Sequence, residues 1–517
     1  MARASVPVAE RPPPLPRPLP SAGAVRYVLR LPQSPPPLRG VHIDGDIARV
    51  PADVLGLIGQ PITPQLVARI EARINHVLAA EGRTVTVRYE PSPAGDAGVL
   101  SFATRPFTVT GLTVRGGGAD TAARLHLREG QPVDPAALAF RLENLNRYPF
   151  RQVDVTVAPA GRANASAVTV EIADTKPWTA YWGVKYAGGP HETWRRLYAG
   201  GSMGDVLGQD SVLSIQVTES PDALLRTRRH RQMADGAIAY SLPVGERGQV
   251  EAGYELTGMT FRFPPDIYWL VENDGTLGYR YFLTGPASGP GQSDVRIGLD
   301  LRHERTIDYQ DDQPVFDAAA EINEVYLGYH FNQVRPDRQS DIDVALRLSP
   351  AVDMPGTKAA HYAAYTGGRM KSARYGYVLL AVDETVGPAA GAQWHSQVSA
   401  MAASGPVPYW DQMILGGQGN VRGYFMADGS FDDAVVWRNE LRLPVKGALA
   451  PFVLADIAIG HDDQLKVTKT LASAGVGVNV KLSAAVSLTC DAAYALRHGP
   501  VTAAGTTVFE AVLKTSY

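Results

Sequence analysis

The segment DVRIGLDLR, Asp294–Arg302, alternates apolar side chains with polar ones along its whole length. The apolar residues are Val295, Ile297, Leu299 and Leu301. The charged residues between and beside them are Asp294, Arg296, Asp300 and Arg302. Successive side chains of a β-strand point to opposite faces, so this period of two predicts a strand with one apolar and one charged face.

The same alternation recurs in two further segments. Residues 341–348 place Ile342, Val344, Leu346 and Leu348 opposite charged neighbours, and residues 484–494 carry a second apolar row. In a soluble sandwich, the apolar face would pack on another sheet. In a membrane barrel, that face would contact lipid and the charged face would line a wet lumen. Alternation alone leaves both architectures open.

The number and spacing of the segments favour the barrel. Sixteen strands can be placed between Lys176 and Tyr517, about 21 residues for each strand and its connection, which suits membrane strands of roughly ten residues. Short and long connections alternate along the chain. The short ones are expected at 243–248, 333–339, 446–448 and 483, and the long ones at 221–232, 260–273, 306–317 and 405–432.

The last predicted strand has the same two faces. Phe509, Ala511, Leu513 and Tyr517 lie on one face, whereas Glu510 and Lys514 lie on the other. A soluble β-protein has little reason to end on such an aromatic, lipid-compatible face. Residues 176–517 are therefore predicted to form a 16-stranded antiparallel transmembrane β-barrel with a long, inward-folded loop at 405–432.

Composition excludes several other classes. Apolar residues make up 45% of the chain, but none of its apolar runs approaches the length of about eighteen residues that a transmembrane helix needs. The formal net charge of −3 gives no indication of a nucleic acid partner. The single cysteine, Cys490, excludes an internal disulfide and a cysteine-based metal site. We find no phosphate loop or catalytic triad, so we expect no enzyme activity, no cofactor and no metal.

Two soluble α+β modules are predicted before the barrel, at 39–105 and 106–175. The first should contain helices 51–57 and 64–80 and strands 84–89 and 98–103. The second should contain strands 107–114, 153–158 and 167–172 and helices 121–127 and 134–145. Such a βααββ module leaves a sheet edge open, and an open edge can accept an extended peptide as an added strand. The alternative is that the modules act only as spacers.

Residues 1–38 form a separate, proline-rich region. Eleven prolines fall between Pro7 and Pro37, which excludes a regular helix and predicts an extended linker. A disordered tail and a spacer that threads another element are both compatible with this composition. The apolar core of a signal peptide is missing after Met1. If the protein is exported, we therefore expect residue 1 to be the start of a mature or an engineered form.

One glycine-rich stretch stands out within the long loop 405–432. Leu415–Tyr424 reads LGGQGNVRGY, with four glycines and the single charge of Arg422. This composition predicts tight turns that present a guanidinium at a chosen point. The spacing is neither G-x-G-x-x-G nor that of a P-loop.

LGGQGNVRGY resembles the V-R-G-Y/F motif of the BamA-type outer-membrane superfamily. This superfamily includes BamA-type insertases and the TpsB transporters of two-partner secretion, the ShlB/FhaC/HecB-type haemolysin secretion/activation family. Three more segments resemble TpsB proteins: residues 142–161 their second POTRA module, DTKPW at 174–178 the junction with the barrel, and WRNELRLPV at 437–445 the strand after the motif loop. The presence of only two POTRA modules favours TpsB over BamA-type insertases.

The resemblance implies a site inside the barrel. The motif loop would be the sixth external loop and would fold into the lumen. Arg422 would then form an ion pair with an acidic residue of the barrel wall. Asp456 occupies the family's F-x-D-x-G position, although Leu454 and Ala458 depart from that pattern. Glu440, which alternation places on the inner face, is a second possible partner. The motif-loop residues are Gly416, Gly417, Gly419, Val421, Arg422, Gly423 and Tyr424.

The resemblance also implies a function, the export of a large unfolded TpsA-like exoprotein across the bacterial outer membrane. The POTRA modules would capture this partner in the periplasm. Phe509, Leu513 and Tyr517 would form a C-terminal assembly signal for the barrel assembly machinery. The alternatives are an outer-membrane barrel assembly factor and a passive porin.

A basic run occurs in the predicted second external loop. It comprises Arg226, Arg228, Arg229, His230 and Arg231. This run is either a solvated loop tip or a contact for the anionic phosphates of lipopolysaccharide.

Overall fold

The computed structural model divides into two compact units, a larger one that holds residues 178–281 and 293–517 and a smaller one that holds the described residues up to 177 together with 282–292. It describes residues 25–27, 36–44, 50, 52–80, 88–90, 98–103, 107–117, 119–160, 165–189, 191, 193–222, 232–283, 291–335, 337–350, 357–388, 391–417, 419–444 and 447–517. Most of the proline-rich region 1–38 and the basic run 226–231 lie outside the described residues.

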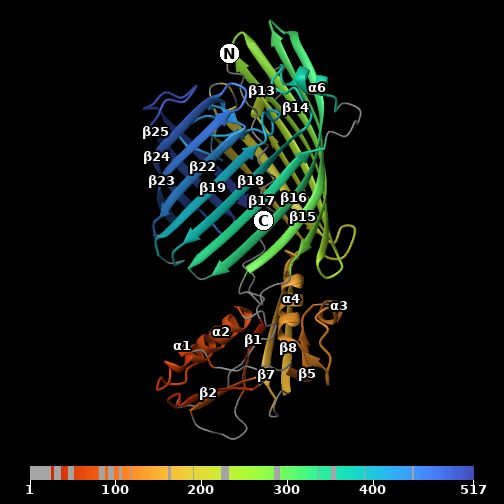
Figure 1. Cartoon of the computed structure of the whole chain (residues 1–517), viewed down its shortest axis with the longest axis vertical. Coiled ribbons are helices and arrows are strands. Elements are labelled where there is room, and N and C mark those ends of the chain that lie inside the picture. The colour runs from red at the N-terminus through yellow and green to blue at the C-terminus, as the bar shows by residue number, and fades with distance from the viewer. Residues whose placement is uncertain are drawn as a thin grey trace. The chain divides into compact units, whose positions relative to one another are not determined.

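The larger unit is a closed barrel of sixteen antiparallel strands, as predicted from the alternation (Figure 1). The strands are β9 (Trp178–Tyr186), β10 (Arg195–Gly204), β11 (Val212–Glu219), β12 (Met233–Val244), β13 (Gly248–Phe263), β14 (Asp266–Phe282), β15 (Gly291–Gln310), β16 (Gln313–Arg335), β17 (Arg338–Ser349), β18 (Tyr375–Val386), β19 (Gln393–Ala403), β22 (Asp433–Arg442), β23 (Leu449–Asp462), β24 (Val467–Lys481), β25 (Val486–Ala495) and β26 (Thr507–Ser516). The barrel closes between its last and first strands, where β26 pairs antiparallel with β9.

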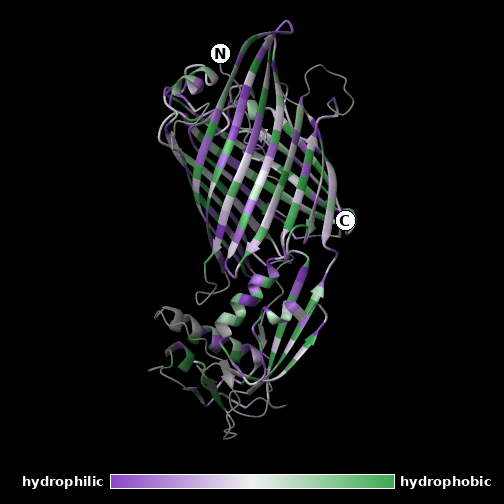
Figure 2. Ribbon diagram, turned by 90° about the vertical axis from the view of Figure 1, so that its right-hand side faces the viewer, coloured by the Kyte–Doolittle hydropathy of each residue, from purple (hydrophilic) through white to green (hydrophobic). Residues whose placement is uncertain are grey.

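Hydrophobic and hydrophilic residues alternate along strands of the barrel (Figure 2), and their burial shows which of them face outward. On β15, Leu299 and Leu301 are about half exposed, whereas Asp300 and Arg302 are buried. On β23, Ile457 is exposed and Asp456 is buried. A lipid-facing surface and a charged interior follow directly from the period of two.

Two predicted long loops, 260–273 and 306–317, are wrong. β13 and β14 are joined by residues 264–265 alone, and β15 and β16 by Asp311 and Asp312. Both aspartates have positive φ angles, 48° and 61°, as a tight two-residue hairpin turn requires. The polar residues of these two segments resemble a loop. The strands nevertheless continue beyond the apolar band as hairpins, because their backbone groups still pair between strands.

One long connection was missed. Residues 350–374 join β17 to β18 and contain the helix α6 (Ala359–Tyr365). Its side chains Tyr362 and Tyr365 are buried. The predicted loop at 405–432 is present as residues 404–432.

The smaller unit contains two sheets with helices. One sheet has the order β2-β4-β3 and the other β1-β7-β8-β5-β6. The strands are β1 (Val25–Tyr27), β2 (Gly40–Asp44), β3 (Arg88–Glu90), β4 (Val99–Ala103), β5 (Phe107–Arg115), β6 (Pro132–Val133), β7 (Arg151–Pro159) and β8 (Ala165–Asp174). The helices are α1 (Ala52–Leu55), α2 (Pro64–Ala80), α3 (Ala119–Ala123) and α4 (Pro135–Asn146). The division into domains at 39–105 and 106–175 stays a prediction.

The proline-rich region is not a linker throughout. β1, which lies inside 1–38, pairs in parallel with β7, with Val25 opposite Val155 and Tyr27 opposite Val157. Val-Arg-Tyr has high β-propensity and lacks proline, so this short stretch can complete an edge that the flanking prolines cannot. The predicted helices 51–57 and 121–127 are also shorter than expected, as α1 and α3.

Candidate functional site

The loop 404–432 is the sixth connection at its end of the barrel, between β19 and β22. It contains the short strands β20 (Met413–Ile414) and β21 (Ser430–Phe431), which pair with each other, and the 3-10 helix η1 (Met426–Asp428). Leu415, Val421 and Tyr424 are fully buried. The loop is therefore a packed element with its own secondary structure.

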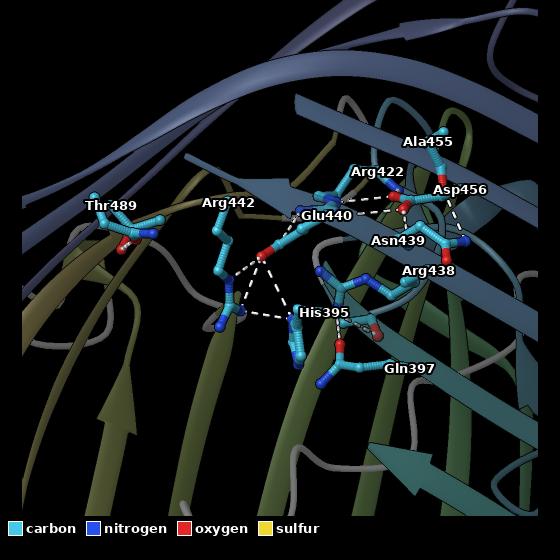
Figure 3. A network of polar contacts seen from close by, with 12 residues as sticks. His395, Gln397, Arg422, Arg438, Asn439, Glu440, Arg442, Ala455, Asp456 and Thr489 are labelled. Atoms are coloured by element: carbon cyan, nitrogen blue, oxygen red, sulfur yellow. Dashed lines mark hydrogen bonds and ion pairs between the residues drawn. The ribbon is translucent and has the colours of Figure 1, made fainter. Parts of the chain in front are cut away.

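Arg422 binds two acidic residues of the barrel wall (Figure 3). Its Nε and Nη2 atoms donate to the two carboxylate oxygens of Asp456, each over 2.8 Å. Its Nη1 atom donates to Oε1 of Glu440 over 2.6 Å, and its backbone N–H donates to Asp456 over 3.2 Å. This fork-on-carboxylate geometry fixes direction as well as charge. The structure thus brings together the three residues that the motif and the alternation had singled out.

Two glycines give the motif its shape. Gly423 has a φ of 87°, and a Cβ there would lie 3.1 Å from the carbonyl oxygen of Ala493. A Cβ on Gly416 would lie 2.2 Å from the carbonyl oxygen of Phe425, which excludes any other residue without backbone movement. Gly419 has open space around it, so its lack of a side chain is not required by packing.

Glu440 connects the motif to a wider polar network. Its second carboxylate oxygen accepts a hydrogen bond from Nε of Arg442 over 2.9 Å. The same oxygen lies 3.5 Å from Nδ1 of His395, whose Nε2 is 3.0 Å from Asp383. Glu440 is therefore shared between cations, whereas both oxygens of Asp456 serve Arg422. Sequence reasoning missed His395, because no local signal marks it.

Burial strengthens this site. The side chains of Arg422 and Asp456 are 2% and 0% exposed. Burial alone would lower the pKa of Arg422, but hydrogen bonds and charge from Asp456 and Glu440 outweigh it and raise the pKa above its ordinary value. Arg422 is therefore a permanent cation, and removing one partner of such a buried pair costs about 3–5 kcal/mol.

Tyr424 ties the motif to a neighbouring strand and connection. Its hydroxyl lies 2.8 Å from the carbonyl oxygen of Ala472 and 2.9 Å from that of Arg497. It also accepts a hydrogen bond from the backbone N–H of Arg497 over 3.0 Å. The aromatic ring fixes the end of the motif, and its hydroxyl joins β24 to the connection after β25.

Replacing Tyr424 by phenylalanine should loosen the motif. The substitution leaves the buried backbone groups of Ala472 and Arg497 without the hydroxyl, which should lower the stability of the loop by about 1–3 kcal/mol. Trypsin should therefore cleave after Arg422 faster than in the parent protein. Tyr409→Phe is the matched control in the same loop, because the Tyr409 hydroxyl donates only to the Thr366 carbonyl, over 3.1 Å. Equal cleavage of the Tyr424→Phe variant and the parent would contradict this role.

Asp428, which sequence reasoning also missed, is a fully buried acceptor four residues after the motif. It accepts backbone hydrogen bonds from Phe425 over 2.9 Å and from Val501 and Thr502 over 2.8 Å each, and another from the Thr502 hydroxyl. The only sequence signal was an aspartate before glycine at the end of a glycine-rich loop. Asp428 fixes loop 404–432 to the connection between β25 and β26.

The C-terminal residues lie away from the motif, on β26 and just after it. Phe509 and Tyr517 are 63% and 69% exposed on the outer surface, and Leu513 is half-buried. Their role as an assembly signal stays a prediction. Within the described residues, no group of three or more potential ligands is placed to hold a metal ion, and no helix is long and apolar enough to cross a membrane.

Comparison with known proteins identifies the barrel. Residues 291–480 match the family of the haemolysin secretion/activation protein ShlB/FhaC/HecB. No curated protein matches the sequence.

Solved structures with the same fold include two CdiB proteins. CdiB from Escherichia coli is 16% identical with a TM-score of 0.65, over 99% of this chain and 94% of that one. CdiB from Acinetobacter baumannii is 15% identical with a TM-score of 0.63, over 96% and 95%. BamA from Haemophilus ducreyi lacking POTRA domains 1–3 is 12% identical with a TM-score of 0.51, over 93% and 100%. Residues 291–480 of the barrel match the ShlB/FhaC/HecB secretion family, in agreement with the resemblance read from the motif, and this match together with the closed barrel indicates an outer-membrane protein.

Proposed function

We propose that this outer-membrane secretion barrel exports a large, unfolded partner exoprotein in the manner of two-partner secretion. The observation that carries the proposal is the motif loop, which is folded against the inner wall of a family-matched barrel and held there by Arg422. A loop anchored inside the lumen must be able to move before a polypeptide can pass. The contact of Arg422 with the wall would therefore control whether a polypeptide can pass through the barrel.

The inner wall suits an unfolded polypeptide. Its side chains include charged residues of both signs, such as Arg296, Arg302, Asp294 and Asp300 on β15 alone. A polar, wet surface gives apolar segments of a passing chain no place to bind tightly. Folding of the partner outside the cell would then supply the direction of transport.

The two sheets of the smaller unit are the proposed capture sites, placed in the periplasm. An extended partner segment would add to a sheet edge through backbone hydrogen bonds. At the β7 edge, the chain's own β1 already pairs over Val25–Tyr27. A partner strand would have to displace β1 there, add at the opposite edge of the same sheet, beside β5 and β6, or add to the β2-β4-β3 sheet.

Deleting residues 39–174 tests the proposal. Secretion of the partner into the medium should be lost, because nothing would capture it, while the barrel should still insert and conduct ions in a planar bilayer. A variant with Arg69→Ala, an exposed residue of helix α2 that belongs to neither sheet, is a control for general effects of changing this unit.

The distribution of proteins in the deletion strain separates the rival functions. Loss of one secreted protein from the medium supports export. Loss of several unrelated barrels from the outer membrane would indicate an assembly factor instead. Unchanged secretion and phenotype would identify a passive channel and overturn the proposal.

A further inference from the structure

Asp411 lies in the same loop as Arg422, eleven residues before it, and is also buried. Its Oδ1 atom is 2.7 Å from Nη2 of Arg302 on β15, which makes a close ion pair. The hydroxyls of Tyr375 and Tyr377 on β18 lie 3.0 and 3.1 Å from its two oxygens and are shared with Glu324, from which they lie 2.7 and 3.2 Å. Three wall side chains thus converge on one carboxylate of the loop.

These partners belong to a different part of the wall from those of Arg422. Arg422 binds β22 and β23, whereas Asp411 binds β15 and β18. In the strand order of the barrel, β16 to β19 lie between β15 and β22. Asp411 therefore attaches the loop to β15 and β18, apart from the adjacent strands β22 to β24 that Arg422 and Tyr424 contact.

The base of the loop around Asp411 is enclosed by apolar side chains. Val407 and Trp410 are 0% and 2% exposed and belong to one buried cluster with Tyr362 of α6. Arg369, from the connection that contains α6, donates through Nε to the Val407 carbonyl over 3.2 Å. The base of loop 404–432 and the connection 350–374 therefore pack as one body at this end of the lumen.

The wall does not depend on Asp411 for its own charge balance. Arg302 also lies 3.2 Å from Glu304 and 3.3 Å from Glu324, both on wall strands. Without Asp411, Arg302 would keep two carboxylates close by. The Asp411 contact therefore contributes mainly to the attachment of the loop.

We propose that Asp411 is a second anchor of loop 404–432, and that the lumen opens fully only when both Arg422 and Asp411 leave the wall. The part of this inference that concerns opening of the lumen rests on the proposed export function. The attachment itself can be measured without any secretion assay. Failure of either idea can therefore be recognised separately.

Labelling of a buried thiol tests the anchor. In a Cys490→Ser background, which removes the only native thiol, Val407→Cys places a reporter in the buried base. Adding Asp411→Asn keeps the size and one acceptor oxygen but removes the charge. We expect a hydrophilic maleimide to label the introduced thiol roughly tenfold faster on the purified, full-length protein, since one lost ion pair of about 1.4 kcal/mol corresponds to that factor.

Asp343→Asn is the matched control for this labelling. Asp343 pairs with Arg296 from one wall strand to another and does not touch the loop. Its labelling rate should equal that of the parent. An unchanged rate with Asp411→Asn, or an equal increase with Asp343→Asn, would overturn the second anchor.

Channel recordings test the requirement for both releases. Arg422→Ala and Asp411→Asn should each raise the open fraction in a planar bilayer, and the double variant should raise it further than either one. A double variant that behaves like Arg422→Ala alone would show that one anchor holds the loop and would overturn the proposal.

Discussion

Replacing Arg422 by alanine should reduce secretion roughly tenfold or more while the barrel still folds, because a loop without its fixed position would obstruct the passing polypeptide even where it lets more ions through. The change leaves the buried Asp456 without its main cation, a loss of about 3–5 kcal/mol for a fully buried pair. The wall strands keep their own backbone pairing, with Trp437 opposite Ile457 and Arg438 opposite Asp456, so the barrel should form. Secreted partner in the medium and the heat-modifiable migration of the barrel on gels measure the two properties.

Related substitutions should form a graded series. Asp456→Ala should match Arg422→Ala, because it removes the same pair from the other side. Arg422→Lys should be intermediate, since lysine keeps the charge but lacks the planar fork that reaches both oxygens of Asp456. Glu440→Gln should have the smallest effect, because the bidentate contact with Asp456 remains. Normal secretion by both Arg422→Ala and Asp456→Ala would show that the anchor does not matter for export.

The alternation of side chains predicts the direction of the wall residues, and the count of sixteen segments, their connection lengths and the face of the last strand are needed to predict the barrel. Asp456 lies between outward Val453 and Ile457 in the sequence pattern, and it is buried in the lumen. Period two is a local property, so one segment reveals its own faces. Arg422 is predicted differently, from the resemblance of LGGQGNVRGY to the V-R-G-Y/F motif, because its glycine neighbours alone are a weak signal.

The second attachment of the loop could not be predicted from the sequence. Asp411 and Arg302 are more than a hundred positions apart, and neither belongs to a motif. Their pairing depends on which wall strands face the base of the loop, a property of the closed barrel. The lengths of β13 to β16 were missed for a related reason, because polar residues in a hairpin beyond the membrane resemble those of a loop.

Replacing Asp428 by alanine should destabilise the protein, because it removes the contacts that hold loop 404–432 to the connection between β25 and β26. Asp428 satisfies the backbone N–H groups of Phe425, Val501 and Thr502, and a buried donor left without a partner costs about 1–3 kcal/mol. The total loss should be on the order of 3 kcal/mol or more. The temperature at which the folded barrel loses its heat-modifiable migration should therefore fall clearly.

Asp317→Ala is the control for this substitution. Asp317 pairs with Arg305 on exposed strand ends, where an ion pair contributes about 0–1 kcal/mol, so its transition temperature should hardly change. Asp428→Asn should lie between the two, because the amide keeps one acceptor oxygen but turns a donor toward the remaining N–H groups. If Asp428→Ala and Asp317→Ala shift the transition equally, Asp428 does not join the two connections. If Asp428→Ala alone shifts it, loop 404–432 stabilises the barrel through the contacts of Asp428 with the connection between β25 and β26.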